Sequence, residues 1–128
     1  MRILLDTHIF VWWNDEPERL SARAFALCQD PANQLVLSVA SIWEMQIKFQ
    51  LGKLTLSAPL SQIVADQQSA NGLEILPVVP AHVFELNNLP PHHKDPFDCL
   101  LIAQSRAENI ALLSVDAILQ SYAVTLLN

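Results

Sequence analysis

Four acidic residues have the side-chain type and the positions in the sequence that metal-assisted chemistry requires. Asp6 follows the aliphatic run Ile3-Leu4-Leu5, and Asp116 follows another apolar run near the end of the chain. Glu44 and Asp98 lie in segments with a helical pattern. A carboxylate placed directly after a buried strand is poorly hydrated and needs a cation or several hydrogen-bond donors. The four acids are therefore expected to converge on one divalent metal beside Asp6, with phosphodiester hydrolysis as the expected chemistry.

Electrostatic repulsion supports the expectation of a bound cation. Two carboxylates about 5 Å apart repel each other by roughly 3 kcal/mol at an effective dielectric constant near 20. Four of them in one cleft would be strongly unfavourable without a positive charge. Hard oxygen ligands select Mg²⁺ or Mn²⁺ over zinc, and the two cysteines, Cys28 and Cys99, do not have zinc-site spacing.

Asp6 and Glu44 each have a structural interpretation as well. Asp6 is followed by a segment with helical pattern and can cap that helix. Glu44 completes the capping-box pattern that begins at Ser41, and it stands four residues before Lys48, the spacing of a helical ion pair. If Ser38 is the true cap, Glu44 lies in the second helical turn and can point towards Asp6.

The two acids of the second half of the chain are open to the same ambiguity. Asp95 before Pro96 has the pattern of a helix start, so Asp95 is interpreted as a structural cap. Asp98, at the third helical position, either complements the helix dipole or reaches towards the strand ends. Asp116 either begins a turn or joins the metal site.

The elements that must position these acids alternate between strand and helix. Strands are predicted near residues 3–5, 35–38, 73–79, 110–115 and 123–127, and helices near residues 7–14, 22–30, 39–50, 57–71, 80–88 and 95–108, with a helical turn at 117–120. Gly52 and Gly72, the only glycines, stand where two of these helices end. Strands that are nearly continuous aliphatic runs indicate a parallel sheet covered on both faces. Ligands of such sheets bind beyond the carboxyl ends of the strands, where the strand order reverses.

Length and composition restrict the class of protein. The chain has 128 residues, no repeat and no long linker, which indicates one domain. A net charge of −6 argues against a protein that coats nucleic acid, while a hydrophobic fraction of 52% leaves apolar surface for protein–protein contact. Neither a signal peptide nor a membrane-spanning run is recognised, so a cytoplasmic location and no membrane association are expected.

Several motifs in this order resemble the PIN-domain family, and most closely the VapC-type toxins of type II toxin–antitoxin systems. The resemblance covers essentially the whole chain and rests on Ile3-Leu4-Leu5-Asp6-Thr7-His8, Ser38-Val39-Ala40-Ser41-Ile42-Trp43-Glu44, Leu51-Gly52-Lys53-Leu54, His92-His93-Lys94-Asp95-Pro96-Phe97-Asp98 and Leu101-Ile102-Ala103-Gln104. It implies a single PIN domain over residues 1–128, built as a three-layer α/β/α sandwich around a central, mostly parallel five-stranded sheet.

The resemblance also implies an activity and a set of site residues. The family's members are Mg²⁺-dependent endoribonucleases, usually dimeric, and their acidic positions correspond to Asp6, Glu44, Asp98 and Asp116. Asp6, Asp98 and Asp116 would hold one or two Mg²⁺ (or Mn²⁺) ions, and Glu44 would ligate through water or orient the nucleophile. The expected partners are an RNA substrate, a cognate antitoxin that inserts a basic side chain into the acidic cleft, and a second copy of the chain.

Other side chains near the motifs are candidates for supporting roles. Thr7 and Ser114 are expected to fix the carboxylates by hydrogen bonds. The cations available to contact RNA are Lys48, Lys53, Lys94 and Arg106. Three tryptophans near the motifs are candidates for the antitoxin contact or the dimer interface: Trp12, Trp13 and Trp43.

Two alternative functions remain compatible with the sequence. The first is a non-catalytic binding module that keeps the fold and uses the acids for structure or for protein recognition. The second is a metal-dependent hydrolase acting on small phosphoesters.

Overall fold

A five-stranded parallel sheet forms the centre of the computed structural model, which describes residues 1–90, 95–115 and 126–127. The strands are β1 (Arg2–Leu5), β2 (Gln34–Ser38), β3 (Glu74–Leu76), β4 (Ala111–Leu113) and β5 (Leu126–Leu127). Their order in the sheet is β3-β2-β1-β4-β5, and every recorded pair is parallel. The helical turn predicted near 117–120 lies outside the described residues.

The strand order reverses between β1, the central strand, and its neighbour β4. The chain first adds β2 and β3 on one side of β1 and later adds β4 and β5 on the other. In the ladder Leu5 is opposite Leu113, and the amide of Asp6 donates to the carbonyl of Leu113 at 3.0 Å. Asp6 and Ser114 therefore leave the sheet side by side at its carboxyl edge, where open α/β sheets bind their ligands.

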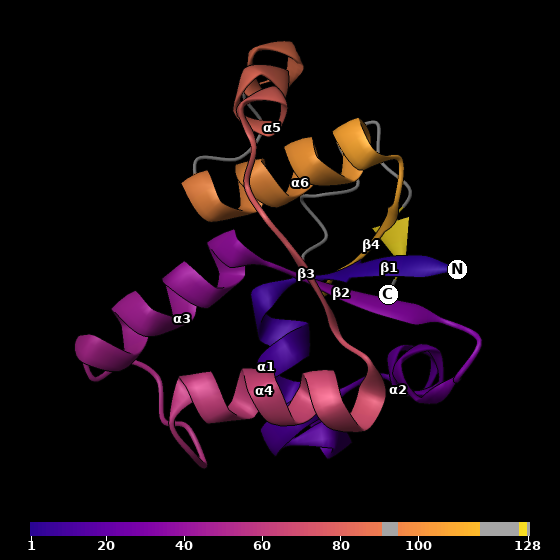
Figure 1. The fold of residues 1–128 in the computed structure, drawn as a ribbon, viewed down its shortest axis with the longest axis vertical. Coiled ribbons are helices and arrows are strands. Elements are labelled where there is room, and N and C mark those ends of the chain that lie inside the picture. Colours follow the sequence, from indigo (N-terminus) through magenta and orange to yellow (C-terminus); the bar gives the residue numbers. More distant parts are fainter. Residues whose placement is uncertain (91–94, 116–125, 128) are drawn as a thin grey trace.

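Helices cover both faces of the sheet and give three layers (Figure 1). One layer holds α1 (Thr7–Asp15), α2 (Ala22–Gln29), α3 (Val39–Gln50) and α4 (Leu60–Asn71), and the other holds α5 (Pro80–Glu85) and α6 (Pro96–Glu108). Short 3₁₀ turns follow α1 at Pro17–Arg19 and α5 at Leu86–Asn88. The predicted three-layer α/β/α architecture is confirmed.

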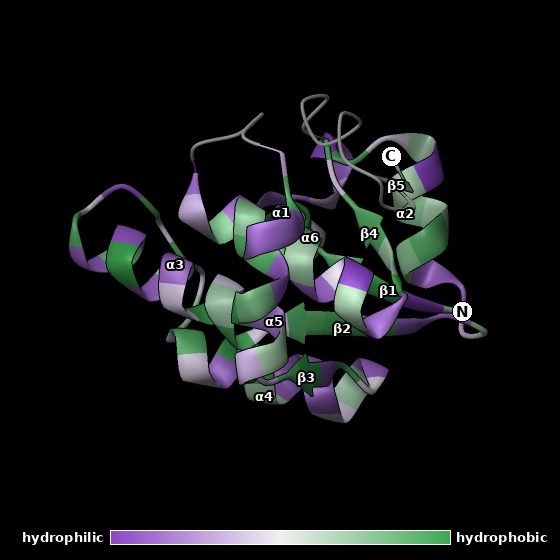
Figure 2. Cartoon of the chain, turned by 90° about the horizontal axis from the view of Figure 1, so that it is seen from above, coloured by the Kyte–Doolittle hydropathy of each residue, from purple (hydrophilic) through white to green (hydrophobic). Residues whose placement is uncertain are grey.

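The core divides into two apolar clusters, one on each face of the sheet. In β1, Ile3 and Leu5 join the cluster beneath α1–α4, whereas Leu4 packs with Leu101 and Ile102 of α6. This division follows from the alternation of side chains along a strand. Figure 2 shows the resulting pattern, with apolar strands between helices of mixed character. Because both faces of the sheet are buried, the last three residues of β1, Ile3–Leu5, are all aliphatic.

Capping residues and glycines set most helix boundaries. The side chain of Ser38 accepts a hydrogen bond from the amide of Ala40 at 3.0 Å, so Ser38 and not Ser41 begins α3. Gly72 ends α4 with a φ of 65°, a left-handed conformation that glycine adopts at little cost. The strand predicted to reach residue 79 ends at Leu76, because Pro77 has no amide hydrogen to extend the ladder.

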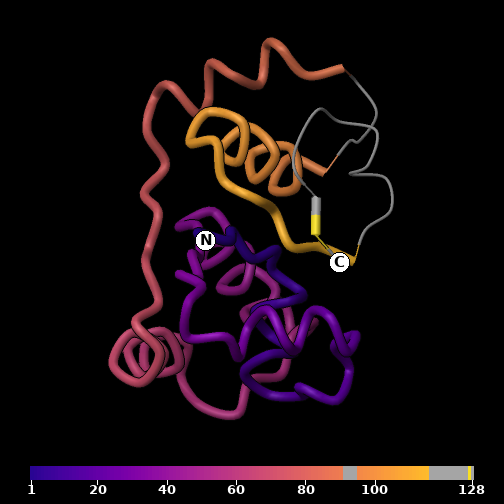
Figure 3. The backbone as a smooth tube through the Cα atoms, turned by 90° about the vertical axis from the view of Figure 1, so that its right-hand side faces the viewer, coloured from indigo at the N-terminus to yellow at the C-terminus, as the bar shows by residue number. Residues whose placement is uncertain are grey.

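The chain passes from the first helical layer to the second along one edge of the molecule. Figure 3 shows the segment between α4 and α5, which contains β3, running along this edge.

None of the helices within the described part of the chain has the length and apolar character needed to cross a membrane.

Candidate active site

Asp6 is buried at the carboxyl end of β1, with 3% of its surface exposed. Its Oδ1 accepts hydrogen bonds from the amides of His8 (2.7 Å) and Ile9 (3.2 Å), so Asp6 caps α1. Its Oδ2 accepts a hydrogen bond from the hydroxyl of Ser114 at 2.6 Å. The capping interpretation of Asp6 is therefore correct. It accounts for Oδ1, while Oδ2 is directed towards the end of β4.

Glu44 is the second buried carboxylate of this edge, with 4% of its surface exposed. It lies in the second turn of α3 because the helix begins after Ser38. The hydroxyl of Thr7 donates to its Oε1 at 2.7 Å, and the ammonium of Lys48 donates to its Oε2 at 2.7 Å. Thr7 directly follows Asp6 in the chain and hydrogen-bonds to Glu44, so this one residue links the two buried acids. The ion pair with Lys48 has the spacing that the sequence indicated.

Lys48 is the cation closest to these acids. Burial lowers the pKa of Lys48. The hydrogen bond and the charge of Glu44, together with the charges of Asp95 and Asp98, raise it by more, so the pKa is raised overall. A raised pKa keeps the ammonium charged at neutral pH. The same interactions show that the start of α6 lies within electrostatic range of Lys48 and hence on the same side of the molecule as Glu44.

Asp95 and Asp98 occupy the start of α6. The Oδ1 of Asp95 accepts hydrogen bonds from the amides of Phe97 (2.9 Å) and Asp98 (3.2 Å), so Asp95 is the helix cap that the sequence predicts. Asp98 is half-buried at the third helical position. Phe97 packs edge-on against Trp43 of α3, with ring centroids 5.4 Å apart. This contact brings the start of α6 against the helix that carries Glu44.

The predicted acidic site is only partly covered by the described residues. Asp116 and Lys94 lie outside them. Within the described ranges, no group of three or more acidic, histidine or cysteine side chains is close enough to hold a metal ion. Arg106 lies eight residues after Asp98, about 12 Å further along α6, and is ion-paired with Glu85 at 2.9 Å. The structure therefore gathers Asp6, Glu44 and the start of α6 at one edge and places Arg106 at the far end of its helix.

The oxygen atoms at this edge have the chemistry that Mg²⁺ prefers. Asp6 and Glu44 supply carboxylates, while Thr7 and Ser114 supply hydroxyls that hydrogen-bond to them. Neither carboxylate has a thiol or imidazole side chain among its recorded hydrogen-bond partners in the described residues. The donor set fits a hard divalent cation, and a complete set of three carboxylate ligands would need Asp116 in addition to Asp6 and Asp98.

The sequence indicated Ser41 only as a possible helix cap, whereas the structure places it in the same buried network. Its hydroxyl oxygen lies 3.0 Å from that of Thr7, and none of its surface is exposed. Ser41 and Glu44 are three residues apart, so they share one face of α3. That spacing was interpreted as a capping box, because sequence alone did not decide which serine begins the helix.

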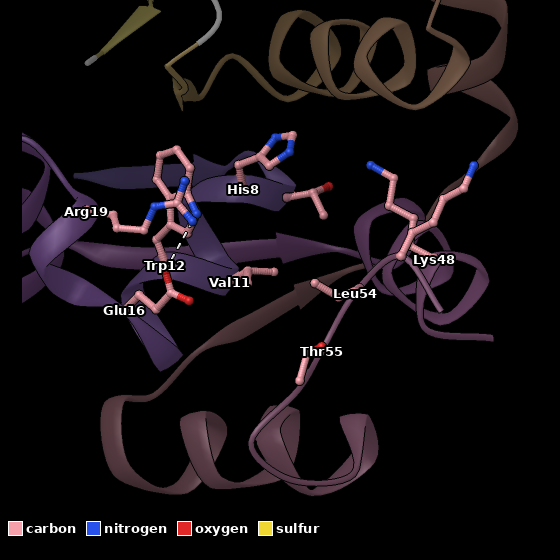
Figure 4. Close-up of a pocket in the computed structure, with 10 residues that line it drawn as sticks. His8, Val11, Trp12, Glu16, Arg19, Lys48, Leu54 and Thr55 are labelled. Carbon is pink, nitrogen blue, oxygen red and sulfur yellow. Dashed lines mark hydrogen bonds and ion pairs between the residues drawn. The ribbon is translucent and has the colours of Figure 1, made fainter. Parts of the chain in front are cut away.

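A cavity of about 480 Å³ opens beside this network and was not predicted (Figure 4). Thr7 and Lys48, the two hydrogen-bond partners of Glu44, are among its lining residues. The other lining residues come from α1, from the 3₁₀ turn and from the segment after α3: His8, Val11, Trp12, Glu16, Arg19, Lys53, Leu54 and Thr55.

Comparison with known proteins assigns the chain to a family. The model of the PIN domain family matches residues 3–124. The chain is 27% identical over 121 residues to Ribonuclease VapC22 of Mycobacterium tuberculosis, covering 94% of this chain and 91% of that protein. In fold it is similar to VapBC2 from Rickettsia felis, solved with a promoter DNA fragment, at a TM-score of 0.73 and 17% identity over 100% of this chain and 98% of that one. It is also similar to FitAcB from Neisseria gonorrhoeae, at a TM-score of 0.65 and 17% identity over 98% of this chain and 96% of that one. With the family match spanning nearly every residue and the fold shared with these structures, the chain belongs to the PIN-domain family.

Proposed function

We propose that the protein is a Mg²⁺-dependent endoribonuclease that acts as the toxin of a toxin–antitoxin pair. The observation that carries this proposal is the pair of buried carboxylates, Asp6 and Glu44, held through Thr7 at the carboxyl edge of the sheet where the strand order reverses. Similarity to a protein named Ribonuclease VapC22 supports RNA as the substrate.

In this proposal Asp6, Asp98 and Asp116 hold the metal. When bound, Mg²⁺ lowers the pKa of a coordinated water and neutralises charge on the phosphate. Ser114 orients the carboxylate of Asp6, and Thr7 orients that of Glu44. Glu44 in turn orients the attacking water or ligates through water, and its ion pair with Lys48 holds its side chain in position.

An antitoxin would cover the apolar surface of α3, next to the acids. Trp43, on the same helix as Glu44, is 61% exposed, and Val39, Phe49 and Leu51 add further exposed apolar surface. A partner that packs on this surface can also extend a basic side chain to the acidic edge. Similarity in fold to VapBC complexes is consistent with such a partner.

RNA cleavage and thermal melting with the Asp6→Asn variant test the proposal. With Mg²⁺ the wild type should cleave structured RNA and the variant should not, and EDTA should abolish the wild-type activity. Mg²⁺ should raise the melting temperature of the wild type only. In EDTA the variant should melt no lower than the wild type, because asparagine also caps a helix and its neutral amide removes repulsion with Glu44.

A specific observation favours a second candidate, the non-catalytic binding module. Asp6 already caps α1 and Glu44 is already paired with Lys48, so both acids have structural roles in the described residues. If this candidate is correct, Mg²⁺ will not stabilise the wild type, and Asp6→Asn will change neither RNA cleavage nor metal response. Hydrolysis of p-nitrophenyl phosphate without RNA cleavage would instead indicate a small-phosphoester hydrolase.

A further inference from the structure

The cavity next to the acidic network has one wall made of three flat side chains, in which Arg19 lies over the Trp12 ring and the His8 ring is tilted by 45° to it. The guanidinium of Arg19 lies 4.6 Å from the centre of the Trp12 ring, and the rings of His8 and Trp12 have centroids 5.9 Å apart. Figure 4 shows these three side chains together, across the cavity from Lys48. Imidazole, indole and guanidinium are all groups on which unpaired nucleobases stack.

The opposite wall is positively charged in a chain whose net charge is −6. Lys48 and Lys53 line it, while the single acid of the lining, Glu16, is ion-paired with Arg19 at 3.1 Å. Lys53 is exposed and, among the described residues, makes no recorded ion pair. Because Arg19 is paired with Glu16 and Lys48 with Glu44, the excess positive charge of the lining comes from Lys53, and the cavity combines this charge with a wall of flat side chains. This is the combination by which proteins hold single-stranded nucleic acid.

The cavity is also continuous with the proposed catalytic edge. Thr7 and Lys48 belong to both, so a ligand in the cavity lies directly beside Glu44. Its volume of about 480 Å³ is within the range of small-ligand pockets. An RNA strand whose scissile phosphate is at the acids could place a neighbouring nucleotide here.

We propose that this cavity is a nucleotide subsite, in which one unpaired base of an RNA strand packs on the wall of flat side chains formed by His8, Trp12 and Arg19 while Lys53 contacts an adjacent phosphate. The choice of RNA rests on the ribonuclease function proposed above. The positive charge favours a polyanion over an antitoxin segment that delivers a basic side chain. Because bases inside an A-form duplex are stacked and paired, the subsite selects single-stranded or looped RNA.

Binding measured without metal tests the wall of flat side chains separately from cleavage. The probes are fluorescein-labelled RNA hexanucleotides and an abasic strand of the same length, titrated with protein in EDTA. Trp12→Leu should weaken binding of the base-bearing strands by about 5- to 150-fold, the range that one stacked base contributes, and should leave binding of the abasic strand unchanged. Trp43→Leu is the matched control. It removes an exposed tryptophan outside the cavity and should leave both dissociation constants unchanged.

Lys53→Gln tests the phosphate contact. It should weaken both kinds of strand by the same factor and should reduce the slope of log affinity against log salt concentration by about 0.7. A selective loss for the base-bearing strands would contradict the assigned role of Lys53.

Two further variants keep the test decisive if Trp12→Leu does not fold, since Trp12 is half-buried against the core. His8 and Arg19 are exposed, so His8→Ala and Arg19→Gln should melt like the wild type and still weaken binding of the base-bearing strands severalfold. Unchanged binding in these variants and in a folded Trp12→Leu would overturn the subsite. So would an equal loss of the abasic strand with Trp12→Leu. Unchanged binding of the base-bearing strands in all these variants is also the result expected if the cavity binds a peptide.

The outcomes also separate this inference from the proposed activity. A wild type that binds bases through Trp12 but cleaves no RNA with Mg²⁺ contradicts the ribonuclease and leaves a nucleotide-binding site. A wild type that cleaves RNA with no dependence of binding on Trp12 keeps the ribonuclease and contradicts the subsite.

Discussion

The ion pair between Glu44 and Lys48 holds a buried charge in place next to Asp6. Glu44 is 4% exposed, whereas the side chain of Lys48 is 38% exposed, so water screens the pair from one side only. The hydroxyl of Thr7 donates a hydrogen bond to the other carboxylate oxygen, so both oxygens of Glu44 have a partner. At the residue scale, one ammonium and one hydroxyl are therefore the recorded partners of Glu44 among the described residues.

Replacing Lys48 by methionine should destabilise the protein, because the buried carboxylate of Glu44 loses its cation while the apolar stem is kept. The expected loss is about 1–2 kcal/mol in the free energy of unfolding, between the values for exposed and for buried pairs. Urea denaturation of Lys48→Met, Glu44→Gln and the double variant measures it, and the double variant should recover most of the loss of Lys48→Met. Lys53→Met, a nearby lysine without a recorded ion pair in the described residues, is the control and should change little.

The same pair predicts a pH dependence. Because the folded-state pKa of Lys48 is raised, its stabilising contribution is fully present below the unfolded value of 10.5 and is lost as the pH rises through the higher folded-state pKa. The difference in stability between wild type and Lys48→Met should therefore shrink above about pH 10.5. A difference that stays constant through this range would show that Lys48 acts by packing.

At the scale of the elements, the N-terminus of α6 shows how a cap positions the site. Asp95 accepts two backbone hydrogen bonds and fixes where the helix begins, and this in turn places Asp98 at its third position. Asp95→Ala should cost about 0.5–2 kcal/mol in the free energy of unfolding, whereas Asp95→Asn should cost much less, because asparagine caps equally well. Chemical denaturation of both variants checks this. Equal losses would indicate that the charge of Asp95, and not its capping, stabilises the helix.

Elements with strong local signals could be predicted from the sequence, and those set by distant contacts could not. Asp95 and Gly72 mark helix ends by their own chemistry, and the structure confirms both. The start of α3 was ambiguous, because both Ser38 and Ser41 are good caps. Only the packing of α3 against the end of β1 decides between them, since it buries Ser41 beside Thr7.

In the candidate site, too, residues with a strong local signal could be predicted and those brought together by distant contacts could not. A carboxylate at the end of an apolar strand has a recognisable pattern, and this singled out Asp6. Glu44 was singled out by its place in the second helical turn after Ser38. The wall of flat side chains has no such pattern, because it forms only when the 3₁₀ turn at Pro17–Arg19 folds back and lays Arg19 over Trp12. The sequence predicts a break between the helices near residues 7–14 and 22–30 but not the direction of the chain between them.

At the scale of the whole molecule, exposed apolar side chains gather on two separate helices. Those on α3 lie beside the acidic edge, which suits an antitoxin. Val83 and Phe84 on α5 are 47% and 71% exposed, and α5 belongs to the opposite helical layer (Figure 1). A hydrophobic fraction of 52% leaves more apolar surface than one small core can bury. The second copy of the chain that the sequence predicts as a partner can be tested at this surface of α5.

Sedimentation velocity at several protein concentrations should therefore show a dimer, and Phe84→Ser should shift it to monomer without lowering the melting temperature of the monomer. Trp43→Ser on α3 is the matched control and should leave the dimer intact. Since each copy carries a net charge of −6, added salt should screen the repulsion between them and strengthen the dimer, whereas it weakens binding of RNA. A wild type that remains monomeric at all concentrations and salt levels would contradict the dimer. A dimer that survives Phe84→Ser and is lost with Trp43→Ser would instead move the interface to α3, where it would compete with the antitoxin for the same surface.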